Sequence, residues 1–378
     1  MSRRRITYIS GTRADFGLMQ ATLERIHRDP RLELGIVATG MHLSAAHGRT
    51  VRDIEASGLP VAATVPVELE PPTGATMARN IGRMLAEFVP VLEREAPQIV
   101  LLLGDRGEML AGALAAIHLN IPVAHIHGGE RSGTVDEPVR HAISKLSHFH
   151  FVATAGARER LVRMGELPQH VHVTGAPGLD GLQALAGRSR AELAADAGLD
   201  PARPVALLVF HPVLQEAAAA GAQAAAVVDT LRRQGLQVLA LLPNADAGSE
   251  GIRQLLAARR DAGDLHLVTH FPRADFVAWM AAADLMVGNS SAGIIEAATF
   301  GTPVVNIGMR QNLRERNANV IDCPAEPVAI AAAVERALRH GRHAPHNVYG
   351  DGAAGPRIVD LLASVPLDAG VLMKTNAY

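Results

Sequence analysis

The sequence predicts an α/β protein made of two similar halves, each with a parallel β-sheet covered by helices on both faces. The chain has 378 residues, and at roughly 150 residues per domain this length suggests two domains. Hydrophobic residues make up 48% of the chain but aromatic residues only 3%, so aliphatic side chains have to fill the cores. Short apolar runs alternate with helical patterns throughout, as they do in sheets that are buried on both faces.

The first half contains six candidate strands, and amphipathic helical patterns separate several of them. The strands are predicted at residues 6–10, 34–39, 99–104, 123–127, 149–154 and 171–174. The helices are predicted at residues 16–28, 78–95 and 108–119. Residues 174–187 are rich in glycine and contain Pro177, so they are predicted to form a loop that links the two halves.

The alternation starts again in the second half. Its strands are predicted at residues 204–210, 237–242, 265–269, 285–288 and 303–306, of which the last completes the sheet. Helices are predicted at residues 216–234, which are rich in alanine, and at residues 356–363. We therefore expect two Rossmann-like domains, at residues 1–180 and 188–350, and a C-terminal helix within residues 351–378 that crosses back to the first domain.

Composition and charge exclude several classes of function. The formal net charge is −2, which gives no sign of the basic surface typical of nucleic-acid-binding proteins. Cys323 is the only cysteine, which excludes an internal disulfide and fits the reducing cytoplasm. The apolar run at residues 6–9 is too short for a signal peptide, and no run of about 18 apolar residues could span a membrane. We expect a soluble, cytoplasmic protein that binds neither nucleic acid nor membrane.

Polar residues follow the predicted strands, where open α/β sheets bind their ligands. The segment GTRADFG after the first strand combines a tight turn, a helix start and Arg13, which together suit a phosphate group. The alternative is an ordinary turn in which Arg13 pairs with Asp15. The segment lacks the GxGxxG pattern, which argues against a dinucleotide enzyme. Asp105 and Arg106 follow the third strand, and Asp105 is either a site residue or a helix N-cap.

The segment HIHGGE and the residues after it form the densest polar cluster. In an alternating strand at 123–127, His125 and His127 would share one face. The glycine pair at 128–129 would let the backbone approach a ligand closely. Glu130, Asp136 and Glu137 follow, and Arg140 and Lys145 could pair with the last two. Such a set suits proton transfer, but metal ligation and a solvated polar loop are the alternatives.

Two further candidates lie in the second half. His211 follows a strand and precedes a proline, so it is either an acid or phosphate donor or a simple turn residue. The segment GNSSAG at residues 288–293 offers backbone N–H groups and two hydroxyls that could hold a diphosphate. Glu296 could accept hydrogen bonds from ribose hydroxyls, and Arg310 could reach a phosphate or a base. The alternative is that Ser290 and Ser291 are only helix caps.

These motifs, taken in order along nearly the whole chain, resemble those of the hydrolysing UDP-N-acetylglucosamine 2-epimerases of bacterial sialic-acid synthesis. No single motif is decisive, but the ordered set is specific. The matching segments are GTRADFG, GMHLSAAHGRT, LGDRGEML, HIHGGERSGTVDEPVRHAISKLSHFHF, FHPV, GNSSAGIIEAATFGTPVVNIGMRQ and YGDG.

The resemblance implies a fold of the glycosyltransferase-B type, in which two Rossmann-like domains face each other across a cleft that holds the active site. The implied reaction converts UDP-N-acetylglucosamine and water to N-acetylmannosamine and UDP. It proceeds by anti elimination to a 2-acetamidoglucal and then by syn addition of water. The resemblance implies no metal and no cofactor, and a homo-oligomer, either a dimer or a tetramer.

The resemblance also assigns roles to residues. It makes Asp105, Asp136 and His211 catalytic or, for His211, phosphate-binding, and it places His42 near the sugar. With the residues proposed from their positions, the candidate catalytic residues are Asp105, His127, Glu130, Asp136 and His211. The candidate substrate-binding and nucleotide-binding residues are Arg13, His42, Arg106, Ser290, Ser291, Gly293, Glu296 and Arg310.

One departure from the family pattern leaves the sugar open. His127 stands where the animal bifunctional enzyme of the family has a catalytic glutamate, so that either His127 or Glu130 could take over its role. The nearest alternative substrate is N,N'-diacetylbacillosamine carried on UDP or GDP, as used in legionaminic-acid synthesis. Two further classes of protein fit the same motifs, namely a glycosyltransferase of the same fold and a non-catalytic nucleotide-sugar sensor.

Overall fold

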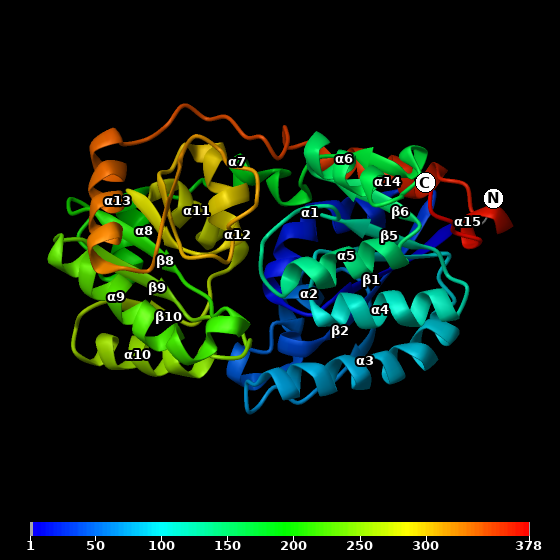
Figure 1. Cartoon of the computed structure of the whole chain (residues 1–378), viewed down its shortest axis with the longest axis horizontal. Helices are drawn as coiled ribbons and strands as arrows, with labels where there is room; N and C mark the ends of the chain where they lie inside the picture. The colour runs from blue at the N-terminus through cyan, green and yellow to red at the C-terminus, as the bar shows by residue number, and fades with distance from the viewer. Residues whose placement is uncertain (1–2, 378) are drawn as a thin grey trace.

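The computed structural model describes residues 3–377, which form two α/β halves lying side by side (Figure 1). The first half is built on a sheet of seven parallel strands in the order β3-β2-β1-β4-β5-β6-β7. These strands are β1 (Arg4–Ser10), β2 (Leu32–Thr39), β3 (Val61–Val65), β4 (Ile99–Leu103), β5 (Val123–Ile126), β6 (Phe149–Val152) and β7 (Val171–Val173).

Helices cover both faces of this sheet. They are α1 (Arg13–Arg28), α2 (Val51–Ala56), α3 (Gly74–Glu95), α4 (Gly107–His118), α5 (Asp136–Leu146) and α6 (Ala155–Arg163). Residues of α1 pack with Tyr8 in one core, and residues of α3 and α4 pack with Ile9 in the other. Tyr8 and Ile9 are neighbours in β1, so they point to opposite faces of the sheet.

The second half repeats the arrangement with six parallel strands in the order β10-β9-β8-β11-β12-β13. They are β8 (Val205–Val209), β9 (Gln237–Leu241), β10 (His266–Val268), β11 (Leu285–Gly288), β12 (Val304–Ile307) and β13 (Val320–Cys323). The helices of this half are α8 (Arg190–Ala197), α9 (Ala220–Arg233), α10 (Ser249–Asp261), α11 (Arg273–Ala282), α12 (Ser291–Ile295) and α13 (Pro327–His340). The predicted α/β class is therefore confirmed.

The end of the chain returns from α13 to the first half (Figure 1). There α14 (Ala354–Ser364) buries Ile358 and Leu362 in the same core as Leu23 of α1. The carboxylate of Asp180 accepts hydrogen bonds from the first two N–H groups of α14, at 2.9 and 2.7 Å. The short helix α15 (Ala369–Leu372) follows. No helix within residues 3–377 has the length and apolar character needed to cross a bilayer.

The structure corrects four details of the sequence-based prediction. β3 and β13 were not predicted, and 303–306 is not the last strand of its sheet. Both missed strands lie at sheet edges and are mostly half-buried, so they lack the complete burial of the central strands. The helix predicted at 216–234 begins at Ala220, because Glu216 has a non-helical conformation. Residues 174–187 connect the two halves but are not an open loop. They contain α7 (Leu182–Leu185), and Leu179 and Leu182 are buried against residues of the second half.

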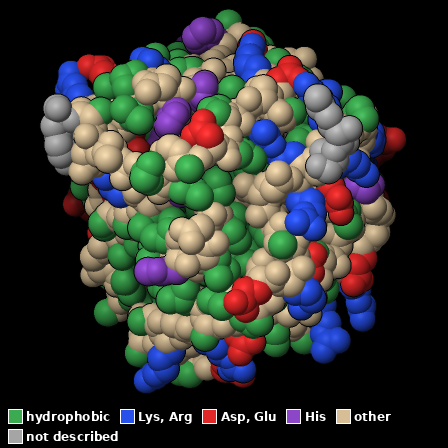
Figure 2. Space-filling view, turned by 90° about the vertical axis from the view of Figure 1, so that its right-hand side faces the viewer, with side chains coloured by type: hydrophobic (Ala, Val, Ile, Leu, Met, Phe, Trp, Pro, Cys, Tyr) green, Lys and Arg blue, Asp and Glu red, His purple; other side chains and the backbone are tan. Residues whose placement is uncertain are grey.

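The outer end of the first half presents an apolar surface. In Figure 2 hydrophobic side chains form a continuous area across the middle of this face, and most charged side chains lie around it. Apolar areas with a polar rim are typical of surfaces that bind another protein. The expected homo-oligomer stays a prediction.

Candidate active site

A cavity of about 400 Å³ lies between the two halves, at the carboxyl ends of the strands. Both sheets contribute the loops that follow their strands, which is where such sheets bind ligands. Ten of the predicted site residues line it: Arg13, Asp105, Arg106, His127, Asp136, His211, Ser290, Ser291, Glu296 and Arg310. The sequence motifs therefore converge on one cavity, although they are spread over some three hundred positions.

Two carboxylates in the cavity have pKa values displaced in opposite directions. Burial opposes the ionisation of Asp105, but the charges of Arg140 and Arg314 outweigh it and lower the pKa of this carboxyl. Arg140 makes a close ion pair with Asp105, and Nη2 of Arg314 lies 3.9 Å from its Oδ2. For Asp136, burial and then the charge of Asp105 raise the pKa. Paired carboxyls of this kind commonly divide their work between a charged and a proton-exchanging group.

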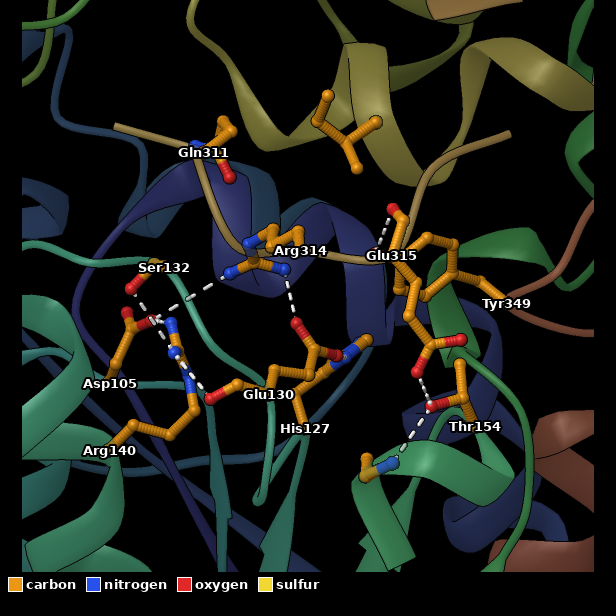
Figure 3. Close-up of polar contacts among 12 residues, drawn as sticks. Asp105, His127, Glu130, Ser132, Arg140, Thr154, Gln311, Arg314, Glu315 and Tyr349 are labelled. Carbon is orange, nitrogen blue, oxygen red and sulfur yellow. Dashed lines mark hydrogen bonds and ion pairs between the residues drawn. The ribbon is translucent and has the colours of Figure 1, made fainter. Parts of the chain in front are cut away.

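His127 and Glu130 form a buried pair at the edge of the cavity. β5 ends at Ile126 and His127 has a φ of 62°, so the strand alternation predicted for His125 and His127 does not reach His127. Nδ1 of His127 makes a close hydrogen bond to Oε1 of Glu130 (Figure 3). The other carboxylate oxygen, Oε2, accepts a hydrogen bond from Nη1 of Arg314. Burial opposes ionisation of Glu130, but Arg314 and His127 hold its pKa well below the usual range. Because the carboxylate can only accept, Nδ1 carries a hydrogen, and Nε2 is the ring nitrogen left for another partner.

Gly128 and Gly129 pack against protein, which corrects the prediction that they make room for a ligand. A Cβ on Gly128 would lie 2.9 Å from Oγ of Ser144, and one on Gly129 would lie 2.4 Å from the carbonyl oxygen of Ala157. Gly129 also has a φ of +75°, which favours glycine. The pair lets the turn after β5 lie directly on α5 and α6.

Gly129→Ala is accordingly expected to reduce stability rather than nucleotide affinity. A matched control is Gly58→Ala, since Gly58 has a φ of +74° but nothing within 4 Å of the new Cβ. Gly58→Ala should cost about 1–2 kcal/mol, the usual cost of the left-handed conformation. Gly129→Ala should lower Tm markedly more in thermal denaturation. Equal Tm values for the two variants would show that contact of the new Cβ with Ala157 adds nothing to the cost of the left-handed conformation.

Arg140 is fully buried and contacts several residues of the site. The sequence indicated it only as a possible partner of Asp136 or Glu137. Besides Asp105, its guanidinium reaches the backbone oxygen of Glu130 at 3.1 Å and Oγ of Ser132 at 3.3 Å. The expected helical pairings are therefore wrong. Lys145 pairs instead with Glu166 at 2.7 Å, and Glu137 accepts the N–H groups of Ser132 and Gly133.

Polar contacts join the two halves around the cavity. Arg314 crosses from the second half to Glu130, and in Figure 3 its guanidinium lies between Glu130 and Asp105. Nη2 of Arg106 lies 3.2 Å from Oδ1 of Asp246. Thr154 donates to Glu315 at 2.5 Å, and Arg253 reaches His47 at 2.5 Å. Asp105, Arg106 and Glu130 were predicted as part of the site. Their partners across the cleft, Arg314 and Asp246, were not, because residues that meet across the cleft share no local sequence signal.

The second half supplies hydrogen-bond donors to the cavity. Asn289 ties the end of β11 to that of β8 through two hydrogen bonds with the backbone of His211, at 2.7 and 2.8 Å. Nδ1 of His211 accepts the N–H of Asn244 at 3.3 Å, and burial and then Arg310 lower the pKa of His211 to about 3. The ring is therefore neutral, with its hydrogen on Nε2.

Other predicted residues have partners that sequence analysis did not foresee. Arg13 pairs with Asp53 at 3.0 Å and not with Asp15, which caps α1 instead. Nη1 of Arg13 is buried and has no partner among the described residues. The carboxylate of Glu296 makes a close ion pair with Arg273, which also lines the cavity.

Three predicted residues, His42, Glu130 and Gly293, do not line the cavity. His42 is buried behind β1, with Ser10 and Thr50 each 2.9 Å from a ring nitrogen. Glu130 stands behind His127, and Gly293 lets α12 pack on β12, because a Cβ there would lie 2.9 Å from Val304. Within residues 3–377 no three histidine, cysteine or acidic side chains are grouped as metal ligands would be.

Comparisons with known proteins agree with this arrangement. A profile of the UDP-N-acetylglucosamine 2-epimerase family matches residues 24–363. The chain is 47% identical to the UDP-N,N'-diacetylbacillosamine 2-epimerase (hydrolyzing) of Legionella pneumophila, over 99% of this chain and all of that one. It is 36% identical to the UDP-N-acetylglucosamine 2-epimerase of Neisseria meningitidis, over 92% of this chain and 91% of the relative.

Solved structures show the same fold. The UDP-GlcNAc 2-epimerase of N. meningitidis bound to UDP-GlcNAc superposes with a TM-score of 0.79 at 19% identity, covering 95% of this chain and 99% of that one. The UDP-GlcNAc 2-epimerase of Methanocaldococcus jannaschii, in complex with UDP-GlcNAc and UDP, gives a TM-score of 0.77 at 20% identity, covering 95% and 99%. Fold, family profile and relatives agree: the chain is an enzyme and belongs to the UDP-N-acetylglucosamine 2-epimerase family.

Proposed function

We propose that the protein hydrolyses a UDP-linked 2-acetamido sugar with inversion at C2, and that its preferred substrate is UDP-N,N'-diacetylbacillosamine. The observation that carries the choice of sugar is the 47% identity to the Legionella enzyme across the whole of both chains. Identity to the Neisseria enzyme named for UDP-N-acetylglucosamine is 36%. The order of the two sugars inferred from sequence motifs is thus reversed, and UDP-N-acetylglucosamine becomes the second candidate.

The donors of the second half support binding of the diphosphate. Ser290 and Ser291 offer hydroxyls, and neutral His211 offers an N–H. Arg310 lines the same part of the cavity and donates to the backbone oxygen of Asn289. These groups would stabilise the charge that develops on UDP as its bond to C1 breaks.

Inversion at C2 requires two proton-transfer groups, because the proton leaves one face of the sugar and returns to the other. We assign them to His127, held by Glu130, and to Asp136. Elimination breaks the C1–O and C2–H bonds and forms a C1–C2 double bond. Water then adds its oxygen to C1 while a proton is returned to C2, so free epimerised sugar and UDP are the products. Asp105 stays ionised and faces the positive charge that develops at C1.

Each proton-transfer group suits its role for a physical reason. A raised pKa brings Asp136 closer to neutrality, where acid–base groups work best. His127 has a free Nε2 only because Glu130 holds its Nδ1–H. Because elimination and hydration move protons and no hydride, no step of this route uses a nicotinamide cofactor.

Steady-state kinetics with both UDP-sugars tests the proposed substrate. We expect kcat/KM to be at least about tenfold higher for UDP-N,N'-diacetylbacillosamine. A site that binds two acetamido groups leaves some of its polar groups unpaired when it binds UDP-N-acetylglucosamine, which has only one. The GDP-linked sugar serves as the control for the nucleotide. A higher kcat/KM for UDP-N-acetylglucosamine would restore that sugar as the substrate, and release of sugar with unchanged C2 would instead favour a glycosyltransferase.

A further inference from the structure

His125 is a polar residue at a position where an apolar one would be expected. It lies in β5 between Ala124 and Ile126, and its side chain is 0% exposed. Burying an imidazole costs free energy unless both ring nitrogens find partners. The proposed reaction uses His127 and gives His125 no role, so its burial calls for another explanation.

Both ring nitrogens of His125 contact elements that carry site residues. Nε2 lies 2.7 Å from the backbone oxygen of Gly104, and Nδ1 lies 3.1 Å from Oγ of Ser144 in α5. The Ser144 hydroxyl has one hydrogen, which it shares between Nδ1 of His125 and the backbone oxygen of Arg140, 3.0 Å away. A carbonyl only accepts, so the hydrogen of the ring is on Nε2. Burial lowers the pKa of His125 to about 3, so the ring is neutral at neutral pH.

The contact with Gly104 fixes the residue before Asp105. The N–H of Gly104 donates to the backbone oxygen of Ile126 at 3.0 Å, so β5 holds Gly104 through both its N–H and its carbonyl. Gly104 has a φ of +82° with nothing within 4 Å of a Cβ. Its conformation, and not crowding, therefore sets the direction in which Asp105 leaves the strand.

The contact with Ser144 fixes the partner of Asp105. Ser144 lies one helical turn after Arg140, on the same side of α5. Arg140 makes the close ion pair with Asp105, and Asp136 begins the same helix. His125 thus connects the loop that carries Asp105 to the helix that carries Arg140 and Asp136.

From these contacts we infer that His125 is a positioning residue, which holds Asp105 and α5 in register through Gly104 and Ser144. The inference rests on the proposed function, because it concerns the geometry of that same site. His125 does not line the cavity and takes no part in proton transfer.

The test compares His125→Phe, His125→Gln and His150→Phe. Glutamine can donate to Gly104 and accept from Ser144, whereas phenylalanine can do neither. His150 is a matched control, because it is the register partner of His125 in β6, is also 0% exposed, and bonds to Glu166 at 2.9 Å away from the cavity. For each variant kcat, KM, Tm and the pH profile of kcat are measured with the UDP-sugar that wild type turns over.

His125→Phe should lower kcat about tenfold to a hundredfold, the scale of a small misplacement of a reacting group, with KM changed less than about threefold. The acid limb of its pH profile should move to higher pH, since Asp105 would lose part of the hold of Arg140. His125→Gln should recover most of the rate, and His150→Phe should keep kcat near that of wild type. A wild-type kcat in His125→Phe, or equal losses of kcat in His125→Phe and His150→Phe, would overturn the positioning role of His125 and leave the proposed function in place. Wild type inactive on both sugars would overturn the proposed function.

Discussion

Asp136→Asn is expected to lower kcat by about a hundredfold or more, the usual loss for an acid–base group, and to raise Tm at neutral pH. The first effect follows because asparagine cannot exchange a proton with C2. KM should change little, since the donors assigned to the diphosphate lie in the second half. The acid limb that Asp136 contributes to the pH profile should disappear with the carboxyl.

The change in Tm follows from the raised pKa of Asp136. Burial and Asp105 lift the folded-state pKa above 3.8, so the favourable contribution of the protonated carboxyl is complete below the unfolded pKa and is lost as the pH rises through the folded pKa. Asparagine avoids this loss at neutral pH. Glu137→Gln is the control, because Glu137 follows Asp136 in α5 and the amide oxygen can still accept from Ser132 and Gly133. A fall in both kcat and Tm for Asp136→Asn would indicate structural damage, and near-normal kcat would remove Asp136 from the mechanism.

Glu130→Gln is expected to lower kcat by about 10²–10⁴-fold, although Glu130 does not line the cavity. Arg314 can only donate, so it holds the amide oxygen, and the amide N–H is left to donate to Nδ1 of His127. The ring hydrogen then moves to Nε2, which removes the proton acceptor. The variant should also lose Tm at neutral pH, in contrast to Asp136→Asn. The lowered pKa of Glu130 means that its stabilising contribution is present above the unfolded pKa and is lost as the pH falls through the folded one.

Glu166→Gln provides a matched control for Glu130→Gln. His150 and Glu166 form a second buried histidine–glutamate pair, which also contacts Lys374 and lies away from the cavity. Turnover is measured below the Tm of both variants. Glu166→Gln should keep kcat within a few-fold of wild type. A Glu130→Gln enzyme within tenfold of wild type would show that His127 does not depend on a carboxylate at Nδ1.

The sequence predicts what depends on local pattern. Buried strands were found from their apolar runs, and residues such as Asp105, His211 and Ser290 were found because they directly follow those strands. The edge strands β3 and β13 were missed, and both are only partly buried, unlike the central strands. Turns are subject to a similar limit. The sequence predicts that the strand continues through His127, but the left-handed conformation of His127 ends it at Ile126.

The partners of the site residues could not be predicted, because tertiary packing decides them. Helical spacing favours a pair between Asp136 and Arg140. Arg140 is buried, however, and pairs with Asp105, which lies after β4 and not in α5. Arg314 reaches Glu130 from 184 positions away, and nothing in its own segment indicates a carboxylate in the other half. These arginines lower the pKa of Asp105 and of Glu130, so the division of roles that we propose for Asp105, Glu130 and Asp136 required the structure.

The most direct test is proton NMR of the purified enzyme with UDP-N,N'-diacetylbacillosamine in heavy water, with UDP-N-acetylglucosamine run in parallel. The account predicts that UDP and a free sugar with inverted C2 appear together, and that the product carries deuterium at C2. Deuterium there shows that the C2 proton left during the reaction and was replaced from solvent. Release of a free sugar that keeps its C2 configuration and its C2 proton would contradict the account, because it would show hydrolysis at C1 without elimination.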